Sequence, residues 1–210
     1  MKNEKRTLIL TTLVCLLPLV AGAILYKDLP ETMATHWNLQ GEADGWSGRA
    51  FAVFGLPGIL LAVNVLLPFL LRADPKRENM SGALVTLTLW SIPALSLLCS
   101  GMTLARGLGY PLRIERWVGI FMGLLFVIIG NYLPKTKQSY TMGIKLPWTL
   151  ASEENWNRTH RLAGFLWVIC GLCFIVFSFV GWSLAGFLVP LAVMVLVPTA
   201  YSYLLYRRGI

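Results

Sequence analysis

The chain has 210 residues, of which 56% are hydrophobic and 13% charged, and its formal net charge is +8. A soluble domain carries about 25% charged residues, so the apolar excess excludes an ordinary soluble protein and predicts an integral membrane protein. The basic residues lie in short connections between apolar segments. This pattern is typical of topology signals and of contacts with anionic lipid, and we expect no direct nucleic-acid partner.

The apolar segments have the length of membrane-spanning helices, which need about 20 residues each. We therefore predict an all-α fold with six transmembrane helices, at Thr7–Tyr26, Phe51–Leu71, Ser81–Ala105, Trp117–Leu133, Leu162–Val180 and Leu184–Tyr206. They suggest three parts: a two-helix module (7–71) with a loop at 27–50, a linking region with the third helix (72–116), and a module (117–206) with a loop at 134–161.

The distribution of Lys and Arg predicts which way the chain crosses the membrane. If the N-terminus is inside, the inner segments hold thirteen of the eighteen basic residues and the outer segments hold five. Basic residues are enriched in cytoplasmic loops. We therefore expect a cell-membrane protein with both termini in the cytoplasm, loop 27–50 outside and loop 134–161 inside. The three arginines of the 106–116 connection run against this assignment.

The first loop is polar but contains two tryptophans, Trp37 and Trp46. Indole rings are costly to leave in water, so we expect the loop to fold onto the membrane surface or over a cavity. Asp44-Gly45 is a typical turn dipeptide, and Gly41 offers a second bend.

The second loop is interrupted by Pro134, Gly143 and Pro147, which exclude one continuous helix. Ser152 is a plausible helix N-cap, with acidic residues in the first turn that follows. From there Trp156, His160, Ala163, Gly164 and Trp167 recur every three or four residues, so they share one helix face.

The starts of the two loops are similar in sequence: Leu133-Pro134-Lys135-Thr136 resembles Leu29-Pro30-Glu31-Thr32. Two explanations stay open: a 3+3 inverted repeat, or chance.

Four polar side chains allow more than one interpretation. His160 is either a ligand or proton carrier, with Glu153 two turns earlier on nearly the same face, or a structural histidine bonded to a loop carbonyl. His36 is equally ambiguous, with acidic neighbours. Asn64 and Asn131, in or at the end of spans, are expected to face the bundle interior, because an unpaired amide is costly in lipid.

The sequence contains few patterns typical of catalytic or metal-binding sites. The two histidines are weak candidates for metal ligands, since neither loop supplies a compact His/Cys set, and we expect neither a metal nor another cofactor. The sequence contains no Ser-His-Asp order, Walker loop or HExxH pattern, so we do not expect an enzyme.

Three ordered motifs carry a family resemblance. Gly130-Asn-Tyr-Leu-Pro-Lys135, Met142-Gly-Ile-Lys-Leu-Pro-Trp-Thr-Leu150 and Trp156-Asn-Arg-Thr-His-Arg161 resemble the SdpI family of bacterial membrane proteins. Pro30, His36-Trp37-Asn38, Gly41 and Asp44-Gly45-Trp46 resemble the small domain of unknown function that often precedes that module. Lys145 departs from the family pattern, in which arginine is common.

The resemblance implies an immunity or signalling protein. The family's name-giving member protects a sporulating bacterium against its own secreted antimicrobial peptide, and it holds an autorepressor at the membrane when toxin is present. A toxin peptide, a cytoplasmic repressor and membrane lipids are thus the partners to expect. A small-substrate transporter and a metal-dependent membrane enzyme remain alternatives.

Two sets of candidate ligand-binding residues follow from the loops and the resemblance. The outer set is Pro30, His36, Trp37, Asn38, Gly41, Asp44, Gly45 and Trp46, and we expect it to meet the peptide. The inner set, for a ligand or partner, is Asn131, Pro134, Gly143, Pro147, Trp148, Glu153, Trp156, His160 and Arg161.

Overall fold

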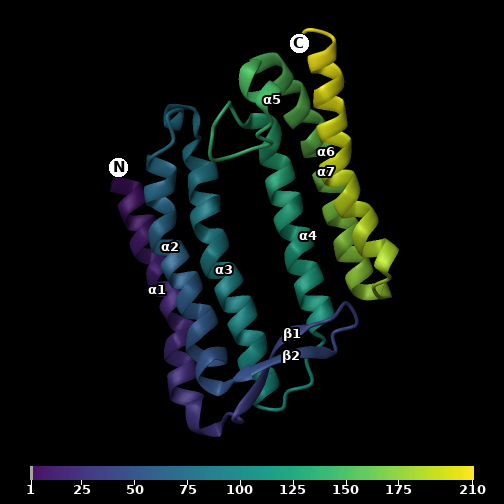
Figure 1. Cartoon of the computed structure of the whole chain (residues 1–210). Helices are drawn as coiled ribbons and strands as arrows, with labels where there is room; N and C mark the ends of the chain where they lie inside the picture. The colour runs from purple at the N-terminus through teal and green to yellow at the C-terminus, as the bar shows by residue number, and fades with distance from the viewer. Residues whose placement is uncertain (1) are drawn as a thin grey trace. The chain divides into compact units, whose positions relative to one another are not determined.

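The computed structural model describes residues 2–210, with side chains from residue 5 onward, and long helices dominate it (Figure 1). Within these residues, six helices are long and apolar enough to cross a membrane. They are α1 (Lys2–Leu25), α2 (Leu56–Arg72), α3 (Gly82–Gly107), α4 (Ile114–Tyr132), α6 (Glu153–Val180) and α7 (Leu184–Arg207). The predicted all-α class and the six predicted spans are confirmed. Most ends move by a few residues, and α6 begins nine residues before the predicted Leu162.

The chain divides into two compact units. The first consists of residues 1–72 and 82–114, and so contains α1, α2 and α3; the second consists of residues 73–81 and 115–210 and contains α4 to α7. The short segment between α2 and α3 therefore belongs to the second unit, although both helices beside it belong to the first.

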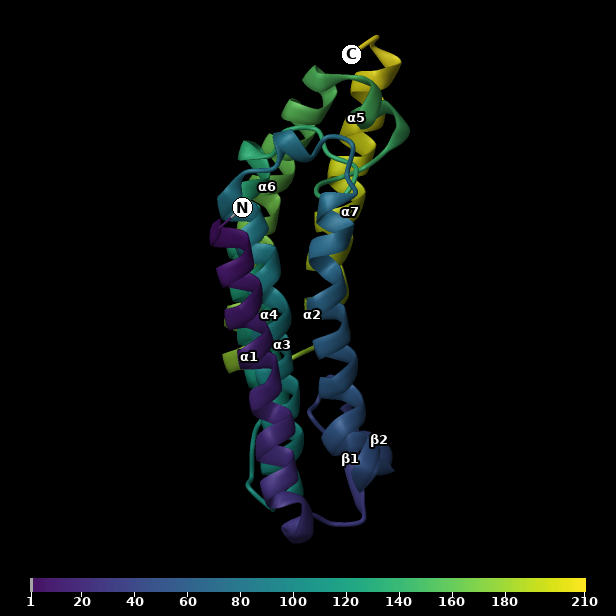
Figure 2. The same cartoon turned by 90° about the vertical axis from the view of Figure 1, so that its left-hand side faces the viewer.

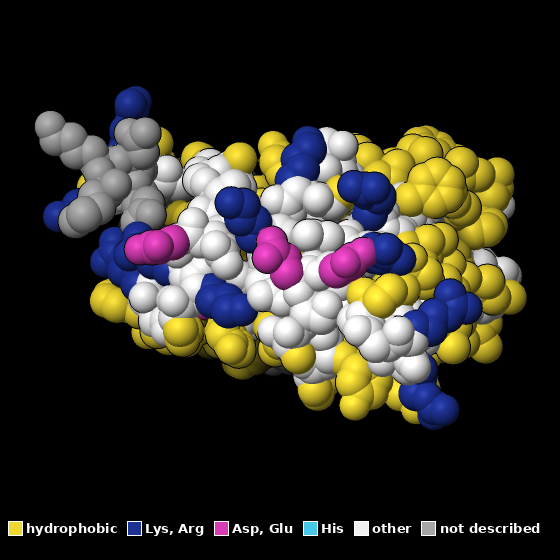
Figure 3. All heavy atoms as spheres, turned by 90° about the horizontal axis from the view of Figure 1, so that it is seen from above, with side chains coloured by type: hydrophobic (Ala, Val, Ile, Leu, Met, Phe, Trp, Pro, Cys, Tyr) yellow, Lys and Arg dark blue, Asp and Glu magenta, His cyan; other side chains and the backbone are white. Residues whose placement is uncertain are grey.

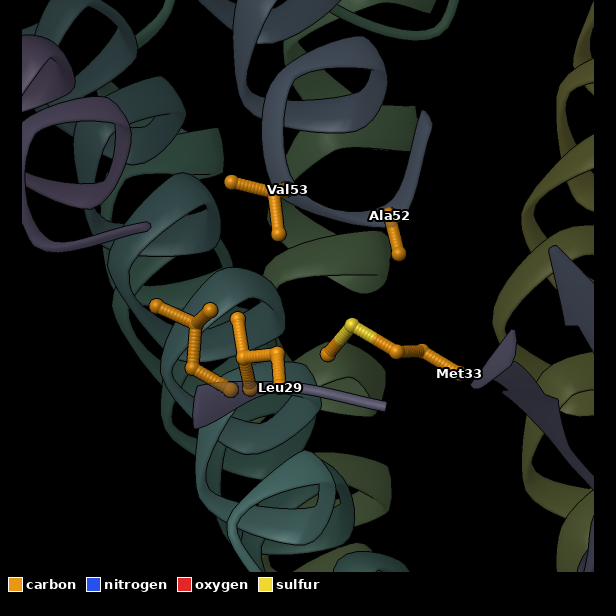
Figure 4. Close-up of a cluster of buried hydrophobic side chains, with 5 residues drawn as sticks. Leu29, Met33, Ala52 and Val53 are labelled. Atoms are coloured by element: carbon orange, nitrogen blue, oxygen red, sulfur yellow. The ribbon is translucent and has the colours of Figure 1, made fainter. Parts of the chain in front are cut away.

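A small apolar core closes one end of the first unit. Leu29, Met33, Ala52 and Val53 are buried together with Leu104 of α3, and Figure 4 shows these side chains converging from separate segments. The polypeptide reaches this core through a 3-10 turn, η1 (Tyr26–Asp28), and leaves it through a π-helical turn, η2 (Phe51–Gly55), that runs into α2.

Between these two turns lies a β-hairpin, where the sequence predicts only a loop. Strand β1 (Thr32–Trp37) pairs antiparallel with β2 (Ala43–Gly48), and the hairpin lies at the end of the unit where α1 stops and α2 begins (Figures 1 and 2). Met33 is 2% exposed and packs into the core, which anchors the hairpin to the helices.

Arg49 fixes the exit of the hairpin. Its guanidinium donates to the carbonyl oxygens of Tyr26 (3.1 Å) and Leu29 (2.9 Å) and lies 4.6 Å from the centre of the Tyr26 ring. A cation that satisfies two carbonyls and an aromatic face ties the end of α1 to the start of η2.

Glycines allow α4 and α6 to approach closely in the second unit. A Cβ added at Gly164 would lie 2.6 Å from the carbonyl oxygen of Gly130, and one at Gly123 would lie 2.6 Å from that of Gly171. Small residues at helix contacts are typical of membrane bundles. Lipid is as apolar as the helix surfaces, so the helices associate through close packing rather than through the hydrophobic effect. An aromatic cluster that includes Phe126 and Phe174, 5.3 Å apart and edge to face, completes this core.

Candidate functional site

The hairpin turn is built on Asn38 and Gly41. The Asn38 side-chain oxygen accepts hydrogen bonds from the backbone N–H groups of Gln40 and Glu42, both 3.0 Å, and its amide donates to the Glu42 carboxylate at 3.1 Å. Gly41 has φ of +77°, which favours glycine. The turn thus lies at 38–42, and the prediction of a turn at Asp44-Gly45 is wrong, because both belong to β2.

Asp44 and Gly45 instead form an irregular pairing opposite His36. His36 pairs with Gly45 and Trp37 with Ala43, so Asp44 is the extra residue of a bulge. The bulge brings the Asp44 carboxylate 2.6 Å from Nδ1 of His36, and the two side chains are 44% and 74% exposed, respectively. Glycine is needed at position 45 because a Cβ there would lie 2.9 Å from the His36 Cβ.

The two tryptophans of the hairpin differ in exposure. Trp46 is 59% exposed, whereas Trp37 is only half-buried and its indole N–H is buried without a hydrogen-bond partner among the described residues. Pro30 is exposed just before β1. The hairpin therefore presents an aromatic ring and a His–Asp pair on its surface.

His160 lies in the interior of the second unit. Its ring stacks on Trp156 with centroids 4.0 Å apart, and both side chains are fully buried. Nε2 accepts the backbone N–H of Ile144 (2.9 Å), and Nδ1 contacts the carbonyl oxygen of Trp156 (2.8 Å). A carbonyl only accepts, so Nδ1 carries the proton and both ring nitrogens are engaged within the protein.

Gly143 makes this arrangement possible. It has φ of +111°, and a Cβ at this position would lie 2.6 Å from both His160 Nε2 and the Trp156 ring. The loop backbone can approach the two rings only because residue 143 has no side chain. The Trp156 indole N–H in turn donates to the carbonyl oxygen of Thr136 at 2.8 Å, which holds the start of the loop.

Asp74, outside the predicted site, is the second anchor of this loop. It lies between α2 and α3, is 6% exposed, and accepts hydrogen bonds from the Ser139 hydroxyl (2.8 Å) and from the backbone N–H groups of Thr141 and Lys76 (both 2.7 Å). Burial alone would raise the pKa of Asp74, but these hydrogen bonds lower it to about 2. The carboxylate is therefore ionised at neutral pH.

Gln138 extends this contact. Its side-chain oxygen accepts from the Lys76 ammonium at 2.8 Å, its backbone oxygen accepts from the Asn79 side chain at 2.8 Å, and its amide donates to the Thr149 carbonyl at 2.9 Å. Segment 73–81 and loop 136–146 thus form one hydrogen-bonded layer. The sequence pattern gave no signal for this layer, because its partners are 59 to 67 residues apart along the chain.

Trp148 and Asn155 attach the rest of the loop to α7. Helix α5 (Pro147–Ala151) begins at Pro147, and the Trp148 indole donates to the Ser202 hydroxyl at 2.9 Å. Asn155 is fully buried and donates to the backbone oxygens of Ser202 and Ile210. The predicted cap at Ser152 is confirmed, because its side chain accepts from the Asn155 N–H.

The remaining inner residues are at the surface. Asn131, Pro134, Glu153 and Arg161 are exposed. The expectation that Asn131 faces the bundle interior is therefore wrong; it lies in the last turn of α4, where water and headgroups can satisfy its amide. Asn64 does face inward, fully buried, and donates to Thr12 of α1 at 3.1 Å. Glu153 is exposed whereas His160 is buried, so the structure does not bring these two together.

Several basic side chains of the second unit are exposed in the inner loop and at the end of α7: Lys135, Lys137, Lys145, Arg207 and Arg208. The face of the molecule that Figure 3 shows carries more Lys and Arg side chains than acidic ones, and no described histidine is visible on it. Within residues 2–210, no group of three or more His, Cys, Asp or Glu side chains is arranged to hold a metal.

These observations define a class: a multi-pass α-helical membrane protein with two structured loops, one an exposed hairpin and the other a buried hydrogen-bonded clamp. Residues 135–202 match the SdpI/YfhL protein family, and residues 13–61 match a domain of unknown function (DUF1648). The chain is 29% identical to "Immunity protein SdpI" of Bacillus subtilis (strain 168) over 206 residues, 97% of each chain. No solved structure matches it. The chain is therefore similar to the SdpI/YfhL family in its second half, and similar to this immunity protein along almost its whole length.

Proposed function

We propose that this protein confers immunity to a membrane-active antimicrobial peptide by binding it or sensing it at the membrane, and that it catalyses no reaction. The observation that carries the proposal is the end-to-end match, over 97% of each chain, to a protein named for immunity. A match of this extent includes both loops and all six spans, so it is not limited to one shared module.

The hairpin is the surface assigned to the peptide. It presents Trp46 at 59% exposure, an amphipathic anchor that suits the boundary between water and lipid. Its charged side chains include Glu31, Glu42 and Asp44 against Lys27 and Arg49. This mildly acidic surface favours a cationic peptide, whose attraction to it falls as salt is raised.

The inner loop is assigned to a cytoplasmic regulator. Lys135, Lys137 and Lys145 are exposed along it, so the partner surface is acidic. This part of the proposal requires loop 134–161 and both termini to be cytoplasmic. Cysteines introduced singly at positions 46 and 158, with the four native cysteines replaced by serine, test it: an impermeant thiol reagent added to intact cells must label only position 46. Labelling of both positions excludes the arrangement.

Peptide challenge tests the immunity function directly. Cells that lack the gene are complemented with the wild-type chain, Trp46→Ala or His36→Ala. They are then exposed to purified cationic, membrane-active antimicrobial peptides. We expect the wild type to restore growth, and both variants to restore it less while reaching the same membrane abundance. Tyr110→Ala is the matched control, because Tyr110 is 60% exposed in the connection after α3. Equal sensitivity with and without the gene would refute immunity.

No observation favours the transporter alternative. The two grooves described in the second unit both lie along exposed side chains of α6, at Glu153–Phe165 and Ile169–Phe177. Neither is a polar chamber between helices near the middle of a span, where a transporter binds its substrate.

A further inference from the structure

An open groove of about 1050 Å³ lies along the first half of α6, beside α7. Seven of its lining residues come from α6 and one, Tyr201, from α7; the α6 residues are Glu153, Glu154, Asn157, Arg158, Arg161, Leu162 and Phe165. His160 does not line the groove, because it is fully buried, and no residue of loop 136–146 is among the lining residues.

One row of side chains in this groove has no internal partner. Glu153, Asn157 and Arg161 recur every four residues, so they lie one above the other on the helix. All three are exposed and make no hydrogen bond or ion pair with any described residue. The neighbouring Arg158 differs, because it is paired with Glu154. The row thus offers a free carboxylate, a free amide and a free guanidinium.

These groups change character along the helix in a fixed order. The carboxylate at Glu153 lies in the first turn, Arg161 lies about 12 Å further into the span, and Phe165 follows at 65% exposure. Side chains on a helix lean toward its N-terminus, so the long Arg161 side chain reaches back toward Glu153. Acid, base and hydrocarbon therefore succeed one another from the water toward the membrane interior.

An apolar stripe continues from this row. Ile169, Leu172, Cys173, Val176 and Phe177 line a second groove of about 260 Å³ on α6. From Arg161 to Val176 the helix rises about 22 Å, which exceeds half of a hydrocarbon core about 30 Å thick. An extended hydrocarbon chain that begins near Arg161 can follow this stripe through one leaflet.

We propose that this groove is a binding site for a zwitterionic phospholipid whose headgroup ends in a primary ammonium, such as phosphatidylethanolamine. From the water inward, such a lipid presents an ammonium, a phosphate and an acyl chain, which is the order of Glu153, Arg161 and the apolar stripe. The guanidinium binds the phosphate through its paired N–H groups, and the carboxylate accepts hydrogen bonds from the ammonium.

Charge selects this lipid over the other common ones. The four charged side chains of the groove, Glu153, Glu154, Arg158 and Arg161, sum to zero, so the site complements a neutral headgroup rather than an anionic one. A choline headgroup has the same net charge but no N–H, so it cannot donate to Glu153. The free carboxylate therefore favours a primary ammonium over a quaternary one.

Lipid binding to the full-length chain in detergent tests the site. Native mass spectrometry with dioleoyl phosphatidylethanolamine, -choline and -glycerol, titrated separately, gives a dissociation constant for each. We expect the ethanolamine lipid to bind about tenfold more tightly than the choline lipid, the worth of one charge-assisted hydrogen bond. Glu153→Gln should abolish this preference, and Arg161→Gln should weaken all three lipids by a similar factor.

Matched variants outside the groove control for charge. Glu78→Gln and Arg208→Gln remove the same charges from exposed positions of the second unit and should leave all three constants unchanged. Thermal unfolding of each variant establishes that it is folded. Three results would each overturn the proposal. The wild type could bind the ethanolamine and choline lipids equally, or Glu153→Gln could keep the preference. The third is a dimer without bound lipid in which a second copy of the chain fills the groove.

Discussion

Replacing Asp74 with Asn should release the inner loop. The carboxylate accepts from Ser139, Thr141 and Lys76, and the substitution turns one acceptor oxygen into an N–H₂ group that faces donors. The pKa of Asp74 falls from 3.8 to about 2, which at about 1.4 kcal/mol per unit corresponds to roughly 2 kcal/mol of native-state stabilisation. Leaving a buried donor without its acceptor costs about the same.

Two measurements in maltoside detergent check this magnitude. A loss of roughly 2 kcal/mol lowers the unfolding temperature by about 4–8 °C, and hydrogen exchange of residues 136–146 should speed up while α6 and α7 stay protected. Glu78→Gln, an exposed acid-to-amide change in the same segment, should do neither. Asp74→Asn with wild-type exchange at Ser139 and Thr141 would refute the role of this carboxylate.

The pH dependence of the same contact has a definite sign. The folded-state pKa of Asp74 lies below its ordinary value, so its stabilisation is complete above about pH 4 and is lost as the pH falls toward about 2. We therefore expect the stability difference between the wild type and Asp74→Asn to stay constant from pH 7 to pH 5 and to shrink below pH 4. A difference that grows on acidification would contradict this account.

Three further substitutions test other parts of the molecule by thermal unfolding. Gly143→Ala should cost about 2–4 kcal/mol, because its φ of +111° is strained for alanine and the new Cβ would meet His160; an unchanged unfolding temperature would contradict the close approach. Arg49→Gln should cost about 2–3 kcal/mol through its lost contacts to two carbonyls and a ring, whereas Lys27→Gln, at an exposed position beside Tyr26, should cost little. Asn64→Leu should change stability by less than about 1 kcal/mol, since hydrogen bonds between membrane helices, like that to Thr12, are weak on average.

The spans could be predicted because the signal for them is long and redundant. About 20 apolar residues in a row identify a membrane helix regardless of the exact residues, and small shifts at the ends do not matter. The buried face of α6 was also predictable, because Trp156, His160 and Ala163 recur with the helical period and are all fully buried.

The hairpin could not be predicted in the same way. Its strands are six residues each, and two irregular pairings interrupt their alternation. Asp44-Gly45 resembles a turn, but the same residues also suit a bulge, where the absent Cβ admits His36. The sequence predicts a tight local bend in both cases, and only the partner strand decides which one forms.

The Asp74 contact was missed for a different reason. Asp74 and Ser139 are 65 residues apart, and nothing in the local pattern of either position identifies the other. A carboxylate in a short charged connection is normally solvated, so burial of this one depends on where loop 136–146 lies. Pairs of this kind depend on the tertiary fold and not on local periodicity.

The two loops therefore differ in what a ligand can gain from them. On the hairpin, His36, Asp44 and Trp46 are exposed, so a peptide can contact them without breaking internal structure. In the inner loop, the hydrogen bonds of Asp74 and His160 are already made inside the protein, and exposing these groups would forfeit them. At about 1 kcal/mol for each neutral bond and more for each bond to a charge, opening the loop costs several kcal/mol. A signal passed inward thus requires a ligand that binds the open state more tightly by at least that amount, about 10³-fold or more.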